Sequence, residues 1–209
     1  MSGKPKLIFD IDGIILDLQG RVISHWNSLV ANGMVTDQSV NIQLPTNPAT
    51  FWFGFSDHQW ENIPQVQKEY YDLISQLTDL ELLEHEIPSI MAQLRQHYHI
   101  ILISAFEYPD KRISNLKLRA IPHDVLYCDI QNKVVFLRDQ VFQDDEYPVA
   151  FFEDRPSTIA KYLENFPGVT IYSPARWKYL EHLKDNPTVK LYNSANEWLS
   201  LIQTEDELI

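Results

Sequence analysis

An alternation of strands and helices in the second half of the chain limits its fold most strongly. Five short apolar runs read as strands, at residues 99–104, 124–130, 149–154, 168–173 and 188–193. Segments with helical periodicity lie between several of them, including 110–121 and the stretch after Pro156, which suits a first helical position. Strands that alternate with helices favour a parallel sheet covered on both faces. The sequence therefore predicts an α/β fold with a doubly wound parallel sheet.

The first half of the chain adds one more strand and a helical insert. Residues 7–10 read as a strand that enters a core, and apolar positions including Val22, Trp26 and Leu29 predict a helix of about four turns after it. Residues 36–64 are rich in proline, asparagine and aromatic residues and show no sustained helical period. Two further helices are expected around 66–77 and 87–94.

Composition excludes several classes of partner. The 209 residues carry a net charge of −12, so a nucleic-acid polymer is not expected, because binding to a phosphate backbone needs clustered Lys and Arg. A small anion in one basic pocket remains compatible with this charge. Cys128 is the only cysteine, which excludes an intramolecular disulfide and fits a reducing compartment. No apolar run approaches the roughly 20 residues of a membrane span, and the start has no signal-peptide character, so we expect a cytoplasmic protein without a membrane partner.

The opening segment LIFDIDGIILD carries acids where a buried strand is expected. An unpaired buried carboxylate would cost several kcal/mol. Polar residues also end two other apolar runs, at Ser104 and at Glu153–Asp154. Ligands of such sheets bind beyond the carboxyl ends of the strands, so these residues and Asp10 are expected to share a site. The alternative is that Asp10 lies past the buried part of the strand and that Asp12 begins a simple turn.

These segments resemble, in order and spacing, the motifs of the haloacid dehalogenase-like (HAD) hydrolase superfamily. The resemblance covers about residues 5–18 and 85–200. Its first motif, DxDG, matches residues 10–13, its second matches the strand that ends at Ser104, and its fourth matches Glu153–Asp154. The third motif is a single lysine, for which Lys133 is our choice. Lys117 and Lys111 are the alternatives.

The resemblance implies a role for each of the two acids of the first motif. Asp10 would be the nucleophile that forms an aspartyl phosphate, and Asp12 would be the general acid and later the base. Mg²⁺ would be bound by Asp10, by the backbone carbonyl of Asp12 and by the fourth motif. We favour Asp154 as the direct ligand there, with Glu153 behind it or in its place.

The remaining site residues would bind the phosphoryl group. Ser104 and nearby backbone N–H groups, including that of Ala105, would hold its oxygens, and Lys133 would neutralise charge that develops during transfer. Gly13 would allow the sharp turn that brings both acids of the first motif to one side. Asp17 is either a further acid of the family pattern or a polar residue that opens the next helix.

The resemblance also implies a division of the chain, with a catalytic core at 1–18 and 85–209 and a small helical cap at 19–84. DIDGIILD and the cap segment TFWFGF make the chain most like the 5'-nucleotidase and deoxyribonucleotidase group. SAF after the second motif and ED in the fourth depart from that group's pattern. In the cap, Phe51 and Trp52, with Phe53 and Trp60, are candidates for a platform that stacks a nucleobase. The alternative is that they fill the cap's own core.

The function implied is a magnesium-dependent phosphomonoesterase, a hydrolase that acts through an aspartyl phosphate. A 5'-nucleotidase would take a nucleoside monophosphate as its small phosphorylated metabolite. The alternatives are a sugar-phosphate phosphatase or phosphomutase of the same superfamily, and a non-catalytic binding protein. A true dehalogenase is disfavoured because Asp12 is retained, and that chemistry needs no proton donor to an alkoxide.

Overall fold

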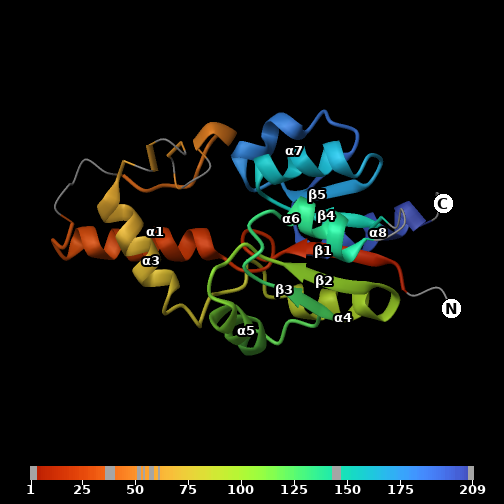
Figure 1. The fold of residues 1–209 in the computed structure, drawn as a ribbon, viewed down its shortest axis with the longest axis horizontal. Coiled ribbons are helices and arrows are strands. Elements are labelled where there is room, and N and C mark those ends of the chain that lie inside the picture. The colour runs from red at the N-terminus through yellow and green to blue at the C-terminus, as the bar shows by residue number, and fades with distance from the viewer. Residues whose placement is uncertain are drawn as a thin grey trace.

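The computed structural model describes residues 4–35, 41–50, 53, 55, 56, 59, 60, 62–142 and 147–206. Within these ranges six parallel strands form one sheet in the order β3-β2-β1-β4-β5-β6 (Figure 1). The strands are β1 (Lys6–Asp10), β2 (His99–Ile103), β3 (Val125–Tyr127), β4 (Ala150–Phe152), β5 (Thr170–Pro174) and β6 (Val189–Tyr192). The predicted doubly wound parallel sheet is therefore confirmed.

Helices cover both faces of the sheet. One face packs against α4 (Ile87–His97), α5 (Pro109–Leu118) and α8 (Trp198–Asp206), and the other against α6 (Lys133–Phe136) and α7 (Pro156–Asn165). Alternate residues of β1 supply the two cores, with Leu7 and Phe9 in the first and Ile8 in the second. Among the described helices, none combines the length and the apolar character that crossing a bilayer requires.

The structure differs from the sequence prediction between residues 127 and 141. β3 ends at Tyr127 instead of residue 130, because the chain turns at Asp129, whose φ is 59°. No helix was predicted in the stretch that follows, yet α6 begins at Lys133 and continues into a π-helix at Leu137–Val141. The Asn132 side chain accepts a hydrogen bond from the backbone N–H of Val135 and so caps this short helix.

Two helices of the insert lie on the side toward which the strands point (Figure 1). They are α1 (Leu18–Ala31) and α3 (Pro64–Ile74), which pack against each other, and a 3₁₀ turn occupies Pro48–Thr50 between them in sequence. The Asp17 carboxylate accepts a 2.8 Å hydrogen bond from the N–H of Gly20 and caps α1. The structure therefore agrees with the second interpretation of Asp17, a polar residue at the start of a helix.

Candidate active site

The acids of the first and fourth motifs meet at the centre of the sheet. β1 and β4 are neighbours, and Phe9 pairs with Phe152, so the next residues, Asp10 and Glu153, leave the sheet side by side. The chain order reverses at this point of the sheet, because β2 lies on one side of β1 and β4 on the other. Such a switch point is where doubly wound sheets bind their ligands.

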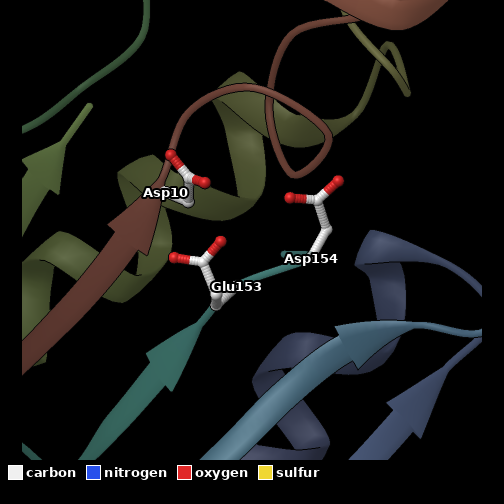
Figure 2. Close-up of side chains that lie close together, drawn as sticks. All are labelled: Asp10, Glu153 and Asp154. Atoms are coloured by element: carbon white, nitrogen blue, oxygen red, sulfur yellow. The ribbon is translucent and has the colours of Figure 1, made fainter. Parts of the chain in front are cut away.

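Asp10, Glu153 and Asp154 form a compact carboxylate cluster. Each offers an oxygen within 4.8 Å of the others, and their side chains face a common space beyond the strand ends (Figure 2). All three residues are buried. Burial and the nearby Asp10 raise the pKa of Asp154 to about 8 and raise that of Glu153 well above its ordinary value. Since a hard cation with oxygen ligands would relieve this repulsion, the cluster fits Mg²⁺.

Lys133 joins this cluster from the start of α6. Its Nζ lies 2.7 Å from Asp10 Oδ2 and 3.0 Å from Glu153 Oε2, and the side chain is buried. Burial alone would lower the pKa of Lys133, but the charges of Asp10 and Glu153 outweigh it and raise that pKa. Of the alternatives for the third motif, Lys117 is exposed on α5. The structure thus brings Lys133 to the proposed nucleophile.

Lys133→Met should destabilise the fold, because it leaves two buried acids without their cation. We expect the free energy of unfolding to fall by about 3–5 kcal/mol. Urea denaturation in metal-free buffer measures this change. Lys117→Met, which removes an exposed lysine, is the matched control and should change stability by about 0.5 kcal/mol or less. Equal effects of the two substitutions would contradict the buried ion pair.

The two acids of the fourth motif have different partners. Glu153 is held through both oxygens, because Oε2 meets Lys133 and Oε1 accepts a 3.0 Å hydrogen bond from the N–H of Arg155. Asp154 Oδ2 accepts a 2.8 Å hydrogen bond from the Tyr179 hydroxyl. Asp154 keeps its other oxygen for a ligand, which favours it over Glu153 as the direct metal ligand.

The backbone at position 13 requires a glycine. Its φ is 81°, a left-handed conformation, and a Cβ at this position would overlap the carboxylate of Asp154. Its carbonyl oxygen accepts a 3.0 Å hydrogen bond from the Trp177 indole. Gly13 therefore allows the first motif to close over the carboxylate cluster.

The second motif ends beside the same site. Ser104 is fully buried, and its hydroxyl oxygen accepts a 3.1 Å hydrogen bond from the N–H of Phe106. Ala105 and Phe106 line a cavity of about 130 Å³ that also contacts Asp10, whereas Ser104 is not among its lining residues. The structure therefore brings Ala105, and not the Ser104 side chain, to the cavity.

Asp12 lies on this cavity and is held by a residue that the sequence analysis missed. Nη2 of Arg112, in α5, lies 2.7 and 2.5 Å from the two oxygens of Asp12. The guanidinium is fully buried and sits 4.2 Å from the centre of the Phe106 ring. Burial raises the pKa of Asp12, and Arg112 opposes that rise. One sequence feature could have revealed that Arg112 is buried. Its helical spacing with Asn115 and Leu116 places the arginine on the buried face of α5.

The segment between β1 and β2 contributes aromatic residues to the cavity wall. Phe53 and Tyr70 line it, and Phe53 is 3% exposed and packs against both Tyr70 and Trp60. Phe53 therefore fills the interior of the insert and borders the cavity as well. Phe51 and Trp52, the other proposed platform residues, lie outside the described residues.

Solved structures share this fold, which is that of haloacid dehalogenase-like hydrolases. One such hydrolase, from Streptococcus pneumoniae, aligns with a TM-score of 0.62 at 15% identity, over 97% of this chain and 100% of that one. A candidate phosphoglycolate phosphatase from Lactobacillus plantarum aligns with a TM-score of 0.59 at 15% identity, over 96% and 100%. The candidate HAD-hydrolase YfnB from Bacillus subtilis, described as bound to magnesium, aligns with a TM-score of 0.56 at 11% identity, over 97% and 100%. No protein-family model matches the sequence, and no curated protein does.

Proposed function

We propose that this chain is a magnesium-dependent phosphomonoesterase of the HAD superfamily that acts through an aspartyl phosphate on Asp10. The observation that carries the proposal is the placement of Asp10 between the ammonium of Lys133, at 2.7 Å, and the acids of the fourth motif. Asp12, two residues after Asp10, lines the same cavity. The fold shared with HAD-like hydrolases supports this assignment.

The proposed reaction has two displacements at phosphorus. An oxygen of Asp10 attacks phosphorus and the bond to the leaving oxygen breaks, while Asp12 gives that oxygen a proton. Asp12 then takes a proton from water, whose oxygen attacks phosphorus and releases Asp10 and inorganic phosphate. Mg²⁺, held by Asp10, Asp154 and the backbone carbonyl of Asp12, would offset the charge of the phosphate dianion. Lys133 stabilises the charge on Asp10 and on the phosphoryl oxygens.

Arg112 is the positioning residue for Asp12 in this mechanism. Arg112→Met should lower kcat by roughly 10- to 100-fold with little change in KM, because Asp12 loses its fixed orientation while the phosphate contacts remain. Steady-state kinetics on an alkyl phosphate measures both constants. Because Arg112→Met leaves the Asp12 carboxylate without its cation, it should also lower the free energy of unfolding, so the kinetics are measured at a temperature at which thermal unfolding shows the variant to be folded.

Arg112→Lys tests whether the lower kcat of Arg112→Met comes from the lost orientation of Asp12. It restores a cation opposite Asp12 and should recover part of the lost kcat. An unchanged kcat in Arg112→Met, or a loss that appears only as a lower melting temperature, would remove Arg112 from the reaction.

Two substrate classes follow from this proposal. A nucleoside monophosphate would use the aromatic residues of the insert, which we propose acts as a cap over the site. A sugar phosphate is supported to a similar degree, because candidate β-phosphoglucomutases are among the proteins that share the fold. A dehalogenase also shares the fold, but this chain retains Asp12, the residue that would give a proton to a leaving oxygen.

A hydrolysis screen tests the proposed function. The purified chain is assayed for phosphate release from p-nitrophenyl phosphate, nucleoside monophosphates and sugar phosphates with Mg²⁺. We expect activity that is lost in a chelator and suppressed by Ca²⁺, whose longer and more numerous bonds suit a bidentate Asp10 that cannot attack. Activity that persists in the chelator, or its absence on every substrate, would contradict the proposal.

A further inference from the structure

Two aromatic residues that follow β5 contact the residues proposed to bind the metal. Trp177 precedes a 3₁₀ helix at Lys178–Leu183, and Tyr179 is the second residue of that helix. Their rings are stacked, with centres 6.0 Å apart and planes inclined by 15°. Both residues are buried. This aromatic pair therefore belongs to the packed interior, although neither residue lies in one of the four sequence motifs.

Tyr179 fixes the orientation of Asp154. Its hydroxyl donates a 2.8 Å hydrogen bond to Asp154 Oδ2 and accepts a 3.3 Å hydrogen bond from Nε2 of Gln19, in the first turn of α1. Since an amide NH₂ group can only donate, the hydroxyl uses its own proton for Asp154. Oδ2 also fills the space that a Cβ on Gly13 would need. The carboxylate is thus held through Oδ2, and its orientation leaves Oδ1 for a cation.

Trp177 holds the turn of the first motif. Its indole N–H donates a 3.0 Å hydrogen bond to the carbonyl oxygen of Gly13. The preceding peptide unit carries the carbonyl of Asp12, which is a proposed ligand of Mg²⁺. A glycine with a φ of 81° gives the backbone wide freedom, and a hydrogen bond to its carbonyl removes much of that freedom. The indole therefore limits the directions in which the Asp12 carbonyl can point.

Mg²⁺ depends strongly on such orientation of its ligands. It demands nearly ideal octahedral geometry with bonds of about 2.0–2.1 Å, so misplaced oxygens bind it poorly. Loss of a group that hydrogen-bonds to a metal ligand typically costs about 10- to 100-fold in metal affinity. Of the three proposed ligands, Asp10 is held by Lys133, and the other two are held from the aromatic pair.

We propose that Trp177 and Tyr179 are positioning residues for Mg²⁺, which orient the Asp12 carbonyl and the Asp154 carboxylate toward the ion. This inference rests on the metal site of the proposed function. It assigns to a segment outside the four motifs the affinity of that site for its metal.

Magnesium titrations without substrate test the aromatic pair. Thermal unfolding of the full chain at increasing MgCl₂ gives an apparent Kd, because an ion that binds only the folded state raises the melting temperature. Tyr179→Phe keeps the ring and removes the hydroxyl, and Trp177→Phe keeps an aromatic ring and removes the indole N–H. We expect the Kd of Mg²⁺ to rise by about tenfold or more in each variant.

Tyr172→Phe is the matched control for a lost tyrosine hydroxyl. Tyr172 is as buried as Tyr179, and its hydroxyl donates a 3.0 Å hydrogen bond to the carbonyl oxygen of Leu201, in α8. Its loss should lower the melting temperature without metal, as in Tyr179→Phe, but leave the Kd of Mg²⁺ unchanged.

The outcomes separate the aromatic pair from the proposed function. An unchanged Kd in Tyr179→Phe or Trp177→Phe, or an equal rise in Tyr172→Phe, would overturn the role of the pair while the phosphatase function stands. No stabilisation of the unaltered chain by Mg²⁺ would overturn the metal site, and with it both the function and this inference. Because no substrate is present, a chain that binds Mg²⁺ but releases no phosphate would contradict the function alone.

Discussion

Asp10→Asn should abolish phosphate release while the protein stays folded. An amide is a poor nucleophile toward phosphorus and does not neutralise a metal ion, so we expect kcat to fall by at least about 10⁴-fold. The fold should tolerate the change, because it removes one of three crowded buried acids. Steady-state hydrolysis of p-nitrophenyl phosphate with saturating Mg²⁺ measures the loss, and thermal unfolding checks the fold.

Asp17→Asn is the matched control for that substitution. Asp17 lies seven residues after Asp10 and caps α1 through the N–H of Gly20. Asp17→Asn therefore removes an acid from the same segment and leaves the proposed nucleophile in place. Asparagine is itself a good cap, and we expect stability to change by well under about 1 kcal/mol and activity to be retained. Substantial turnover by pure Asp10→Asn protein would refute Asp10 as the nucleophile.

Asp154→Asn should stabilise the metal-free protein at alkaline pH and weaken its response to Mg²⁺. Burial and Asp10 raise the pKa of Asp154 to about 8. For an acid whose pKa is higher in the folded state, the folded protein binds more protons than the unfolded one between the ordinary pKa and the raised one. The free energy of unfolding of the metal-free chain should therefore fall as pH rises from about 4 to about 8.

The asparagine variant removes that titration and keeps an oxygen that can accept the Tyr179 hydrogen bond. Its free energy of unfolding should change less with pH and exceed that of the unaltered chain by roughly 2–4 kcal/mol at pH 8 without metal. Urea denaturation at several pH values, with and without Mg²⁺, gives both quantities. Added Mg²⁺ should stabilise the unaltered chain through binding to the folded state, and stabilise the variant much less.

Glu153→Gln serves as the comparison for the choice of metal ligand. Since Glu153 is held by Lys133 and the Arg155 N–H, its change should weaken Mg²⁺ binding less than Asp154→Asn does. The opposite ranking in a magnesium titration would show that Glu153 is the direct ligand.

The sheet could be predicted because its signal is local. Buried parallel strands are continuous apolar runs, and the helices between them have a different period. The stretch around α6 was missed because its helix is four residues long and depends on the cap at Asn132, which leaves almost no periodic pattern. The sequence prediction extended β3 to residue 130 because the segment YCDI contains apolar residues. The chain in fact turns at Asp129, so the strand ends earlier.

The sequence predicted those residues of the candidate site that stand at the ends of strands. Asp10, Glu153 and Asp154 meet because the carboxyl ends of neighbouring parallel strands share one edge. Arg112 was missed because an arginine in a helix of mixed charge reads as exposed until the tertiary structure buries it. Its pairing with Asp12 joins residues 100 positions apart, a contact that no local pattern encodes.

Trapping the phosphorylated enzyme tests the central claim most directly. In Asp12→Asn, p-nitrophenyl phosphate can still phosphorylate Asp10, because nitrophenolate leaves without a proton, whereas the second step lacks its base. Mass spectrometry of the quenched and digested variant, after reaction with Mg²⁺, should find one phosphoryl group on the peptide that contains Asp10. The group should be released by hydroxylamine and be absent from the Asp10→Asn protein. A phosphoryl group on another residue, or none on a variant that releases nitrophenolate, would contradict the account.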